Sequence, residues 1–474
     1  MTAAEGEPGR RAFSANRISM QEETCNIPAL TGPGLYIAPA HRIYGEPGLP
    51  SSKYYTLRYL LAATLARGES TVSLPAASDD SDALFRGCCA LGAELTWSDE
   101  QKQVLCIHGV GRPYQAEPVT VDVGNAGAVL RLLLGVSALL PEVTFLTDYS
   151  QSLGKRPNRE LLEALTSLGA RCEGTGREGY LPVTIRGGRL HGGKVSISGA
   201  RSSQFLSSLL FLAPLLEESL QIEVIDDLKS RAMVQVTLNV LREAGIVVEH
   251  DKTLRHFFIA AGQIYRPRDY VVPGDYPSAA ALLSACAVTA DPTSEIRLAR
   301  LRPGEEDGEA LLEALKAMGT DLHIDGENIT LRGGRRLHSI KMDGDRAIDC
   351  VPVLVALACF ADGESIFYNI ENLHYKESDR IDDLCLELQR AGCAVTPRRD
   401  AIFVQGLPQG VEGGVIVDGH SDHRLLMALA IVALRSRCGL TLTGVEHIAK
   451  SYPHFFGDLK RLGIRIEEER KHAT

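Results

Sequence analysis

Short polar segments that carry a lysine or an arginine recur along this 474-residue sequence, at points where a helix is predicted to begin. Examples are Lys53 with Arg58, Lys376 with Arg380, and Lys450. Free backbone N–H groups and the helix dipole bind anions at such N-termini, and added cations make them phosphate or carboxylate sites. One such segment is usually a solvated surface charge, but the whole set predicts a strongly anionic small-molecule ligand.

Three further polar residues, Asp349, Glu377 and His423, each have an ordinary structural explanation in the sequence alone. Asp349 could cap the apolar helix that follows it, and Glu377 could be an ordinary acid in a first helical turn. His423, between Asp422 and Arg424, could be a buried, satisfied histidine. The remaining segments are residues 125–131, 155–159, 202–204, 230–231 and 422–424.

The elements that must position these segments form a repeat. Apolar residues four apart on a helix are followed by a glycine, which ends the helix in a left-handed conformation, and then by a short alternating strand. This pattern occurs six times and predicts six helix–sheet units of an α/β protein, grouped as two halves of three with a ligand site in the cleft between them. The six glycines, spaced 71 to 77 residues apart, are Gly92, Gly169, Gly245, Gly319, Gly392 and Gly463.

Stretches rich in proline and glycine mark where the halves should meet. One covers residues 272–277, after the third unit, and another covers residues 45–50, before the first. We therefore predict a discontinuous first domain of residues 35–51 plus 272–474, and a second domain of residues 52–271. Residues 1–34 are predicted to be a flexible N-terminal extension, because they are polar and rich in Gly, Pro and Glu.

Composition excludes several classes of function. The formal net charge is −10, which argues against nucleic acid as the partner, because phosphate backbones need a basic face. The longest apolar stretches are about a dozen residues, too short to span a membrane, and no apolar signal-peptide segment follows Arg10 and Arg11. The 11 cysteines form no CxxC pair and no set with metal-ligand spacing. A soluble, cytoplasmic protein without a metal is predicted.

Five motifs, in combination and in order, carry a resemblance to a known family. They read VGNAG, RSSQFL, YKESDRI, SDHR and AKSYP. They resemble the motifs of the enolpyruvyl transferases, and those of the 5-enolpyruvylshikimate-3-phosphate synthase branch more closely than those of the UDP-N-acetylglucosamine branch. The resemblance runs from about residue 36 to about residue 468. It implies two inside-out domains of three units each, with the active site between them.

The implied reaction transfers the carboxyvinyl (enolpyruvyl) group of phosphoenolpyruvate to a hydroxyl of a phosphorylated acceptor, and it releases phosphate. The resemblance implies no metal or organic cofactor. It assigns Asp349 to the acceptor hydroxyl, Glu377 to proton transfer at C3 of phosphoenolpyruvate, and Lys53 to charge stabilisation and proton transfer. Asp422 and His423 would support the site.

The resemblance also assigns residues to catalysis and to each substrate. Catalysis is assigned to Lys53, Asp349, Glu377, His423 and Lys450. Phosphoenolpyruvate binding is assigned to Lys53, Asn125, Gly127, Arg156, Gln204, Arg380, Arg424 and Lys450. Acceptor binding is assigned to Tyr54, Arg58, Ser202, Ser203, Ser230, Asp349, Asn372 and Lys376.

The acceptor side departs from the shikimate branch. Tyr54 stands where that branch has serine, and Met233 where it has tyrosine; Ser152 and His374 each replace an arginine. Tyrosine and methionine offer flat, soft, apolar surface, which suits a planar group such as a nucleobase. The favoured acceptor is therefore the 3′-hydroxyl of UMP, as in the branch that acts in nikkomycin- and polyoxin-type antibiotic biosynthesis. The alternatives are shikimate-3-phosphate and, from another class, an inactive repeat protein that binds an anionic ligand.

Overall fold

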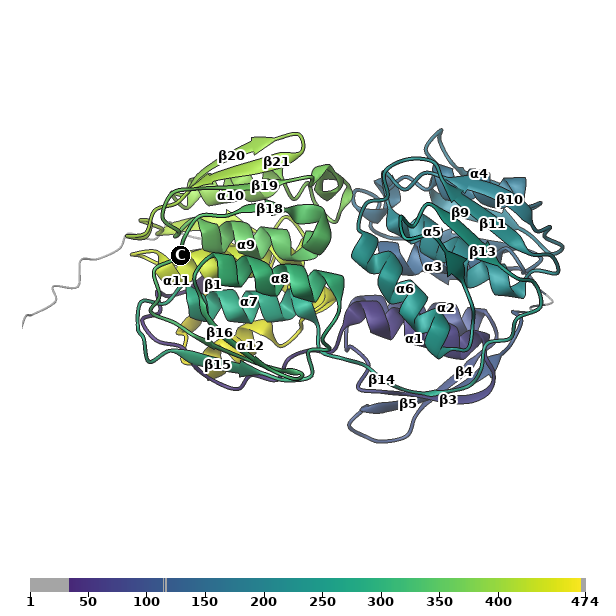
Figure 1. The fold of residues 1–474 in the computed structure, drawn as a ribbon, viewed down its shortest axis with the longest axis horizontal. Coiled ribbons are helices and arrows are strands. Elements are labelled where there is room, and N and C mark those ends of the chain that lie inside the picture. Colours follow the sequence, from purple (N-terminus) through teal and green to yellow (C-terminus); the bar gives the residue numbers. More distant parts are fainter. Residues whose placement is uncertain (1–33, 114, 116, 470–474) are drawn as a thin grey trace, which may run out of the picture.

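The computed structural model describes residues 34–113, 115 and 117–469, which form two halves that lie side by side (Figure 1). The predicted N-terminal extension lies outside the described residues except for Gly34, which begins the first strand. Each half has its own buried apolar core. One core is built from residues 35–49 and 276–466, and the other from residues 55–272. Among the described residues, no helix is long and apolar enough to cross a membrane.

Six four-stranded sheets share one pairing pattern, in which one outer pair of strands is parallel and the other two pairs are antiparallel. The first half contains the sheets β22-β23-β1-β24, β16-β17-β15-β2 and β18-β19-β21-β20. Their strands are β1 (Gly34–Ile37), β2 (Tyr44–Gly45), β15 (Glu295–Leu298), β16 (Asp321–Asp325), β17 (Asn328–Arg332), β18 (Lys341–Asp343), β19 (Glu364–Tyr368), β20 (Ala394–Arg398), β21 (Ala401–Gln405), β22 (Val415–Asp418), β23 (Leu440–Thr443) and β24 (Ile466–Glu469).

The second half contains the sheets β14-β3-β5-β4, β6-β7-β9-β8 and β10-β11-β13-β12. Their strands are β3 (Arg67–Ser73), β4 (Glu94–Trp97), β5 (Val104–Val110), β6 (Val119–Asp122), β7 (Val143–Leu146), β8 (Arg171–Thr175), β9 (Tyr180–Arg186), β10 (Gly193–Ile197), β11 (Leu220–Val224), β12 (Glu249–His250), β13 (His256–Ile259) and β14 (Asp269–Val271).

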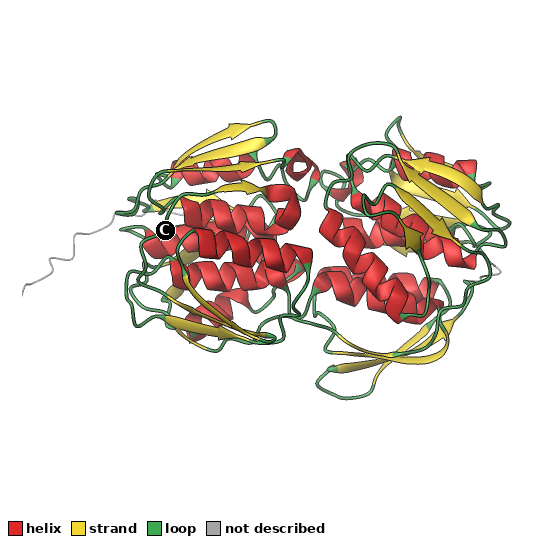
Figure 2. Cartoon of the chain, viewed as in Figure 1, coloured by secondary structure: helices red, strands yellow, loops and turns green. Residues whose placement is uncertain are grey.

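Two kinds of helix alternate along the chain. The odd-numbered α-helices are buried over nearly their whole length, and the even-numbered ones bury a single face. The helices gather in the middle of each half, and the sheets lie toward the outside (Figure 2). The helices are α1 (Lys53–Leu65), α2 (Asp79–Ala90), α3 (Gly127–Ser137), α4 (Arg159–Ser167), α5 (Ser203–Leu212), α6 (Arg231–Glu243), α7 (Tyr276–Ala287), α8 (Glu306–Ala317), α9 (Val351–Ala358), α10 (Asp382–Arg390), α11 (His423–Arg435) and α12 (Phe455–Arg461), with short 3₁₀ turns η1 (Leu153–Lys155), η2 (Ala213–Leu215), η3 (Gly344–Cys350), η4 (Glu371–Tyr375) and η5 (Val445–Lys450).

The six glycines of the predicted repeat follow the even-numbered helices, each two residues after the helix ends. All six have a left-handed backbone, with φ between 84° and 106°. Glycine adopts this conformation without the steric cost that a Cβ atom imposes, so it ends each helix and turns the chain into the next strand. The helix ends predicted from the sequence are confirmed.

The chain passes between the halves at two neighbouring places. The Ser52 N–H donates to the Pro273 carbonyl at 2.7 Å, and the Asp275 N–H donates to the Pro50 carbonyl at 2.9 Å. Ser51 and Gly274 form an antiparallel bridge between these bonds. Both crossings lie directly before a buried helix, α1 in one half and α7 in the other, so they set where each helix begins.

Gly109 tests how closely α1 must approach its sheet. A Cβ atom at Gly109, in β5, would overlap the carbonyl oxygens of Ala63 and Ala66 at the end of α1. We expect Gly109→Ala to lower the free energy of unfolding by about 1–3 kcal/mol through overpacking. Gly48→Ala, where a Cβ atom meets nothing within 4 Å, should change it by less than about 0.5 kcal/mol. Urea denaturation of both variants measures the difference, and equal stabilities would contradict the close approach.

Candidate active site

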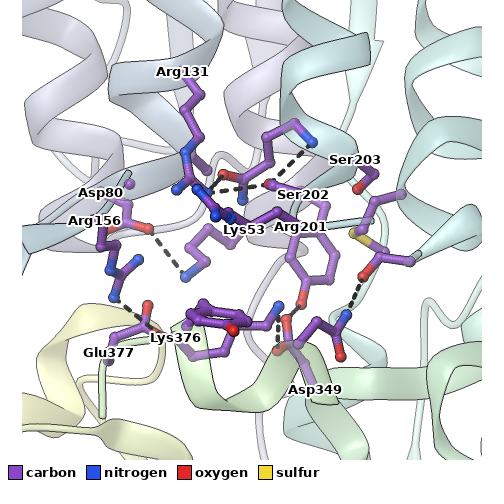
Figure 3. A pocket seen from close by; sticks show the side chains of 18 of the residues that line it. Lys53, Asp80, Arg131, Arg156, Arg201, Ser202, Ser203, Asp349, Lys376 and Glu377 are labelled. Carbon is purple, nitrogen blue, oxygen red and sulfur yellow. Dashed lines mark hydrogen bonds and ion pairs between the residues drawn. The ribbon is translucent and has the colours of Figure 1, made fainter. Parts of the chain in front are cut away.

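A pocket lies between the two halves, where the first turns of several helices converge (Figure 3). It contains about 820 Å³ of space, part of it open to solvent. Most residues predicted for the site line this pocket, and they come from both halves of the chain. They are Lys53, Tyr54, Arg58, Gly127, Arg156, Ser202, Ser203, Gln204, Ser230, Asp349, Asn372, Lys376, Glu377, Arg380 and His423.

Three predicted residues are not part of the pocket wall. Two of them, Asn125 and Lys450, line an adjoining cavity, which shares the residue Asp80 with the pocket. The third, Arg424, is buried behind the wall. All three nevertheless lie close to the pocket. The Lys450 ammonium contacts Glu377 and donates to the Asn125 carbonyl at 2.6 Å, and the charge of Arg424 acts on Asp349.

Side-chain caps fix the helix starts that face the pocket. The Ser52 hydroxyl accepts from the Tyr55 N–H and begins α1, so that Lys53 is the first residue of the helix. The Ser202 hydroxyl accepts from the Gln204 N–H at the start of α5. Such caps satisfy N–H groups that the helix itself leaves unpaired, and they hold the neighbouring side chains in place.

Lys53 forms a buried ion pair with Asp80, whose carboxylate lies 3.0 Å from the ammonium. Asp80 is in the first turn of α2, and the other oxygen of its carboxylate has no hydrogen-bond partner among the described residues. Asp80 was not predicted from the sequence, because it has no motif of its own. The only sequence signal is the group of three acids at the start of α2 (Asp79, Asp80 and Asp82), which equally suits an ordinary helix N-terminus.

Arg380 is the centre of the charged network. It is 1% exposed, and its guanidinium lies 2.7 Å from each of the Asp349, Glu377 and Asp422 carboxylates. Burial alone would lower the pKa of Arg380, but the three acids raise it well above its usual range. The Asp422 side chain also caps α11, so this arginine fixes a helix start as well as two candidate catalytic carboxylates.

Glu377 is surrounded by cations. Besides Arg380, the Lys450 ammonium lies 3.2 Å from its carboxylate and the Arg156 guanidinium lies at 3.7 Å. Burial opposes ionisation, but these three cations outweigh it and hold the pKa of Glu377 well below its usual range. The structure places Glu377 before α10 rather than in its first turn, so the simple alternative of a helix-dipole acid does not apply.

Asp349 occupies the other side of Arg380. Its carboxylate contacts Arg380, lies 3.6 Å from the Lys376 ammonium and accepts a hydrogen bond from the Tyr54 hydroxyl. Burial raises the pKa of Asp349, but Lys376, Arg380 and Arg424 together hold it well below its usual range. Asp349 lies in η3 and is not the N-cap of α9, so the alternative that it merely caps the following helix is wrong.

Several buried donors around this network have no hydrogen-bond partner within the described residues. They include Nε and Nη2 of Arg156 and Nε of Arg424. Neither ring nitrogen of His423 has a hydrogen bond to any residue that the structure describes, so the alternative of a satisfied histidine is wrong. Burial and the charges of Arg424 and Lys53 lower the pKa of His423 well below its usual range, so the ring is neutral. Unpaired buried donors of this kind are suited to an anionic ligand.

The residues predicted for the acceptor join the two halves. The Ser230 hydroxyl accepts from Asn372 at 3.1 Å, and the Ser230 N–H donates to the Asp345 carboxylate at 2.7 Å. Asp345 was missed, because nothing near it in the sequence resembles a site motif. Arg58 lines the pocket, and three of its N–H groups donate to Thr237 Oγ1 and to two backbone carbonyls, which anchor the guanidinium in the wall.

The departures from the shikimate branch do not all face the pocket. Met233 lines it. The Ser152 hydroxyl donates to the Glu377 carbonyl at 3.2 Å. The His374 ring is held at 2.7 Å by Asp379 and at 2.9 Å by the Arg399 carbonyl. His374, Asp379 and Asp382 lie close enough to hold a metal ion, but these bonds already engage both ring nitrogens of the histidine.

The chain matches a known protein family over most of its length. The family model described as EPSP synthase (3-phosphoshikimate 1-carboxyvinyltransferase) matches residues 37–459. The 3-phosphoshikimate 1-carboxyvinyltransferase of Deinococcus radiodurans is 43% identical over 435 residues, covering 91% of this chain and 96% of that protein. The protein of the same name from Burkholderia pseudomallei is 36% identical, covering 89% and 93%.

Solved structures resemble the chain over the same extent. EPSP synthase from Acinetobacter baumannii has a TM-score of 0.78 and 26% identity, covering 93% of this chain and 100% of that one. The enolpyruvyl transferase NikO from Streptomyces tendae has a TM-score of 0.73 over 93% and 99%, but its 18% identity shows only a shared fold. The chain therefore belongs to the EPSP synthase family of carboxyvinyltransferases, as the sequence motifs predicted.

Proposed function

We propose that this enzyme transfers the carboxyvinyl group of phosphoenolpyruvate to a hydroxyl of shikimate-3-phosphate and releases phosphate. The observation that carries the proposal is the buried charge network, in which Arg156, Arg380 and Lys450 surround the ionised Glu377. Lys53, which is paired with Asp80, lines the same pocket. A trianionic substrate loses its hydration on entering such a site, and oriented cations and amides are needed to offset that cost.

The acceptor in this proposal differs from the one predicted from the sequence. The relatives that cover about nine-tenths of the chain, at 31–43% identity, are called 3-phosphoshikimate 1-carboxyvinyltransferases. NikO resembles the chain in fold alone. The comparisons therefore favour shikimate-3-phosphate over UMP. The ring of Tyr54 suggested a nucleobase as the acceptor. Its hydroxyl donates a hydrogen bond to Asp349, however, and this bond limits how the Tyr54 side chain can contact an acceptor.

The proposed chemistry has two steps. The acceptor hydroxyl attacks C2 of phosphoenolpyruvate while C3 gains a proton, and the tetrahedral intermediate then loses phosphate and one C3 proton. Asp349 is ionised and accepts the hydroxyl proton. Glu377 is also ionised and suits removal of the C3 proton in the second step. A carboxylate held ionised is a poor acid, so the ammonium of Lys53 supplies the proton in the first step.

The two halves are proposed to act as inside-out domains that close on the substrates. Their bounds follow the two crossings, with residues 35–51 plus 272–474 in one and residues 52–271 in the other. The pocket wall includes Lys53 and Gln204 from one side and Asp349 and Glu377 from the other, so the site is complete only when both sides meet. Closure would exclude water and strengthen each charged contact.

The acceptor is tested by phosphate release from phosphoenolpyruvate. We expect turnover with shikimate-3-phosphate and none above background with UMP. The charge network suits phosphoenolpyruvate as the donor, and the names of the relatives favour shikimate-3-phosphate as the acceptor. Turnover with UMP alone would reverse the assignment. Binding of phosphoenolpyruvate without phosphate release, with either acceptor, would instead support the inactive anion-binding protein.

Asp349→Asn and Glu377→Gln test the two carboxylates. Each change keeps the shape but removes the base, so kcat should fall by about 10²- to 10⁴-fold. Asp325→Asn, at an exposed acid in β16, is the matched control and should leave kcat unchanged. Steady-state assays over both substrates measure the effect, and a loss of less than tenfold at either carboxylate would remove it from the mechanism.

His423 predicts a pH dependence of stability. An unfolded histidine takes up a proton below about pH 6.5, but the folded His423 stays neutral because its pKa is lowered. Stability is therefore lost as the pH falls below about 6.5, at up to about 1.4 kcal/mol per pH unit from this residue.

The measurement is urea unfolding of the substrate-free protein between pH 7 and pH 5. His423→Gln should be less sensitive to pH than the unchanged protein. His323→Gln, at an exposed position in β16, is the control and should keep the original pH dependence. Identical slopes for the protein and its His423 variant would show that folding does not lower the pKa of His423.

A further inference from the structure

Arg131 lines the pocket but was not among the residues assigned to catalysis or to either substrate. It comes from the second turn of α3, is 6% exposed, and reaches toward Ser202 at the start of α5 (Figure 3). Its Nη1 donates to the Ser202 hydroxyl at 3.1 Å and to the Gln204 side-chain oxygen at 2.9 Å. One guanidinium nitrogen thus contacts two residues of the same predicted substrate-binding motif.

The rest of the guanidinium is anchored in the protein. Nη2 donates to the Pro157 carbonyl at 3.2 Å, and Nε approaches the Asn158 side-chain oxygen at 3.5 Å. The guanidinium also packs on the Phe205 ring, 4.9 Å from its centre. Burial and the charge of Arg156 lower the pKa of Arg131 to about 9, so it remains protonated at neutral pH. Its position and its role as a donor are therefore both fixed.

A guanidinium has only donors, and this determines the orientation of the Gln204 amide. The amide atom at 2.9 Å must be the oxygen, because the NH₂ group cannot accept a hydrogen bond. The NH₂ group, with two donors, then points away from Arg131. Gln204 lines the pocket, so Arg131 fixes which end of its amide is available there.

The same argument applies to Ser202. Its hydroxyl oxygen accepts from Arg131 Nη1 and, at 3.3 Å, from the Gln204 backbone N–H. Two donors occupy both lone pairs of the oxygen, so the hydroxyl proton is all that Ser202 can offer to a further partner. Ser202 also lines the pocket.

We infer that Arg131 is a positioning residue that makes Ser202 and Gln204 act only as hydrogen-bond donors toward the anionic groups of the two substrates. This inference rests on the proposed function. Without Arg131, the neutral side chain of a serine or glutamine can turn an oxygen lone pair toward a phosphate or carboxylate. The lone pair would then repel that anionic group. Arg131 removes that alternative, and through Gln204 and Ser202 it acts on the phosphoenolpyruvate and acceptor sides together.

Arg131→Lys and Arg131→Met separate this role from that of a nearby positive charge. Lysine keeps the charge but cannot hold Ser202, Gln204 and the Pro157 carbonyl with one nitrogen in the same geometry. In both variants we expect the KM for phosphoenolpyruvate and for shikimate-3-phosphate to rise at least about tenfold, with a smaller change in kcat. Wild-type KM values in Arg131→Lys would overturn the inference, as would a lower melting temperature with unchanged KM values.

Gln204→Glu tests the orientation without altering Arg131. The glutamate still offers Arg131 an oxygen, but it presents a second oxygen to the pocket in place of the NH₂ group. The KM for phosphoenolpyruvate should rise at least about tenfold with an unchanged melting temperature. Gln221→Glu, at an exposed position in β11, is the matched control. An unchanged KM in Gln204→Glu would overturn the inference even if the Arg131 variants failed to fold.

A double-mutant cycle tests whether Arg131 acts through Ser202. Ser202→Ala should cost less in the Arg131→Met background than in the original protein, and additive losses would overturn the link. Turnover of shikimate-3-phosphate by the original protein is measured first, so that its absence is assigned to the proposed function. Calorimetric binding of phosphoenolpyruvate to the original protein, Arg131→Lys and Gln204→Glu then tests the inference independently, and equal affinities would overturn it.

Discussion

The buried guanidinium of Arg380 is the interaction on which the geometry of the site depends. A charge removed from water costs several kcal/mol unless it is paired and hydrogen-bonded, and Arg380 meets that requirement with Asp349, Glu377 and Asp422. These acids come from η3, from the segment before α10 and from the cap of α11. Pairing therefore forces three elements to converge, and it holds two of the acids as ionised bases that face the other half of the molecule.

Much of the fold could be predicted because it repeats. The six glycines after helices can be recognised in the sequence, because few residues other than glycine adopt the left-handed conformation that this turn requires. Helix starts with polar caps were equally visible, so residues such as Lys53 and Gln204 were found together with the elements that carry them. The resemblance to a family then supplied the order of these motifs and the chemistry that they share.

Residues without a motif could not be predicted. Asp80 and Asp345 matter through side chains that meet partners far away in the sequence, and such pairs become visible only when the helices are packed. Arg131 belongs to the predicted basic segment 125–131, but its contacts with Ser202 and Gln204 become visible only in the folded chain. The acceptor was the other weak point. Tyr54 and Met233 were interpreted by residue type, but the hydroxyl of Tyr54 is directed at Asp349, which residue type alone does not reveal. Substitutions in the pocket wall, such as those at Tyr54 and Met233, change the surface that meets the ligand but do not identify the ligand.

The two crossings between the halves have a consequence for how the molecule is assembled. Residues 52 and 273 are joined by a single backbone hydrogen bond, although more than two hundred residues of chain lie between them. The second half is thus an insertion whose ends are adjacent, and it has its own core. Such a segment can be exchanged or duplicated in evolution without disrupting the fold of the first half. Its removal leaves two neighbouring chain ends that a short peptide can join.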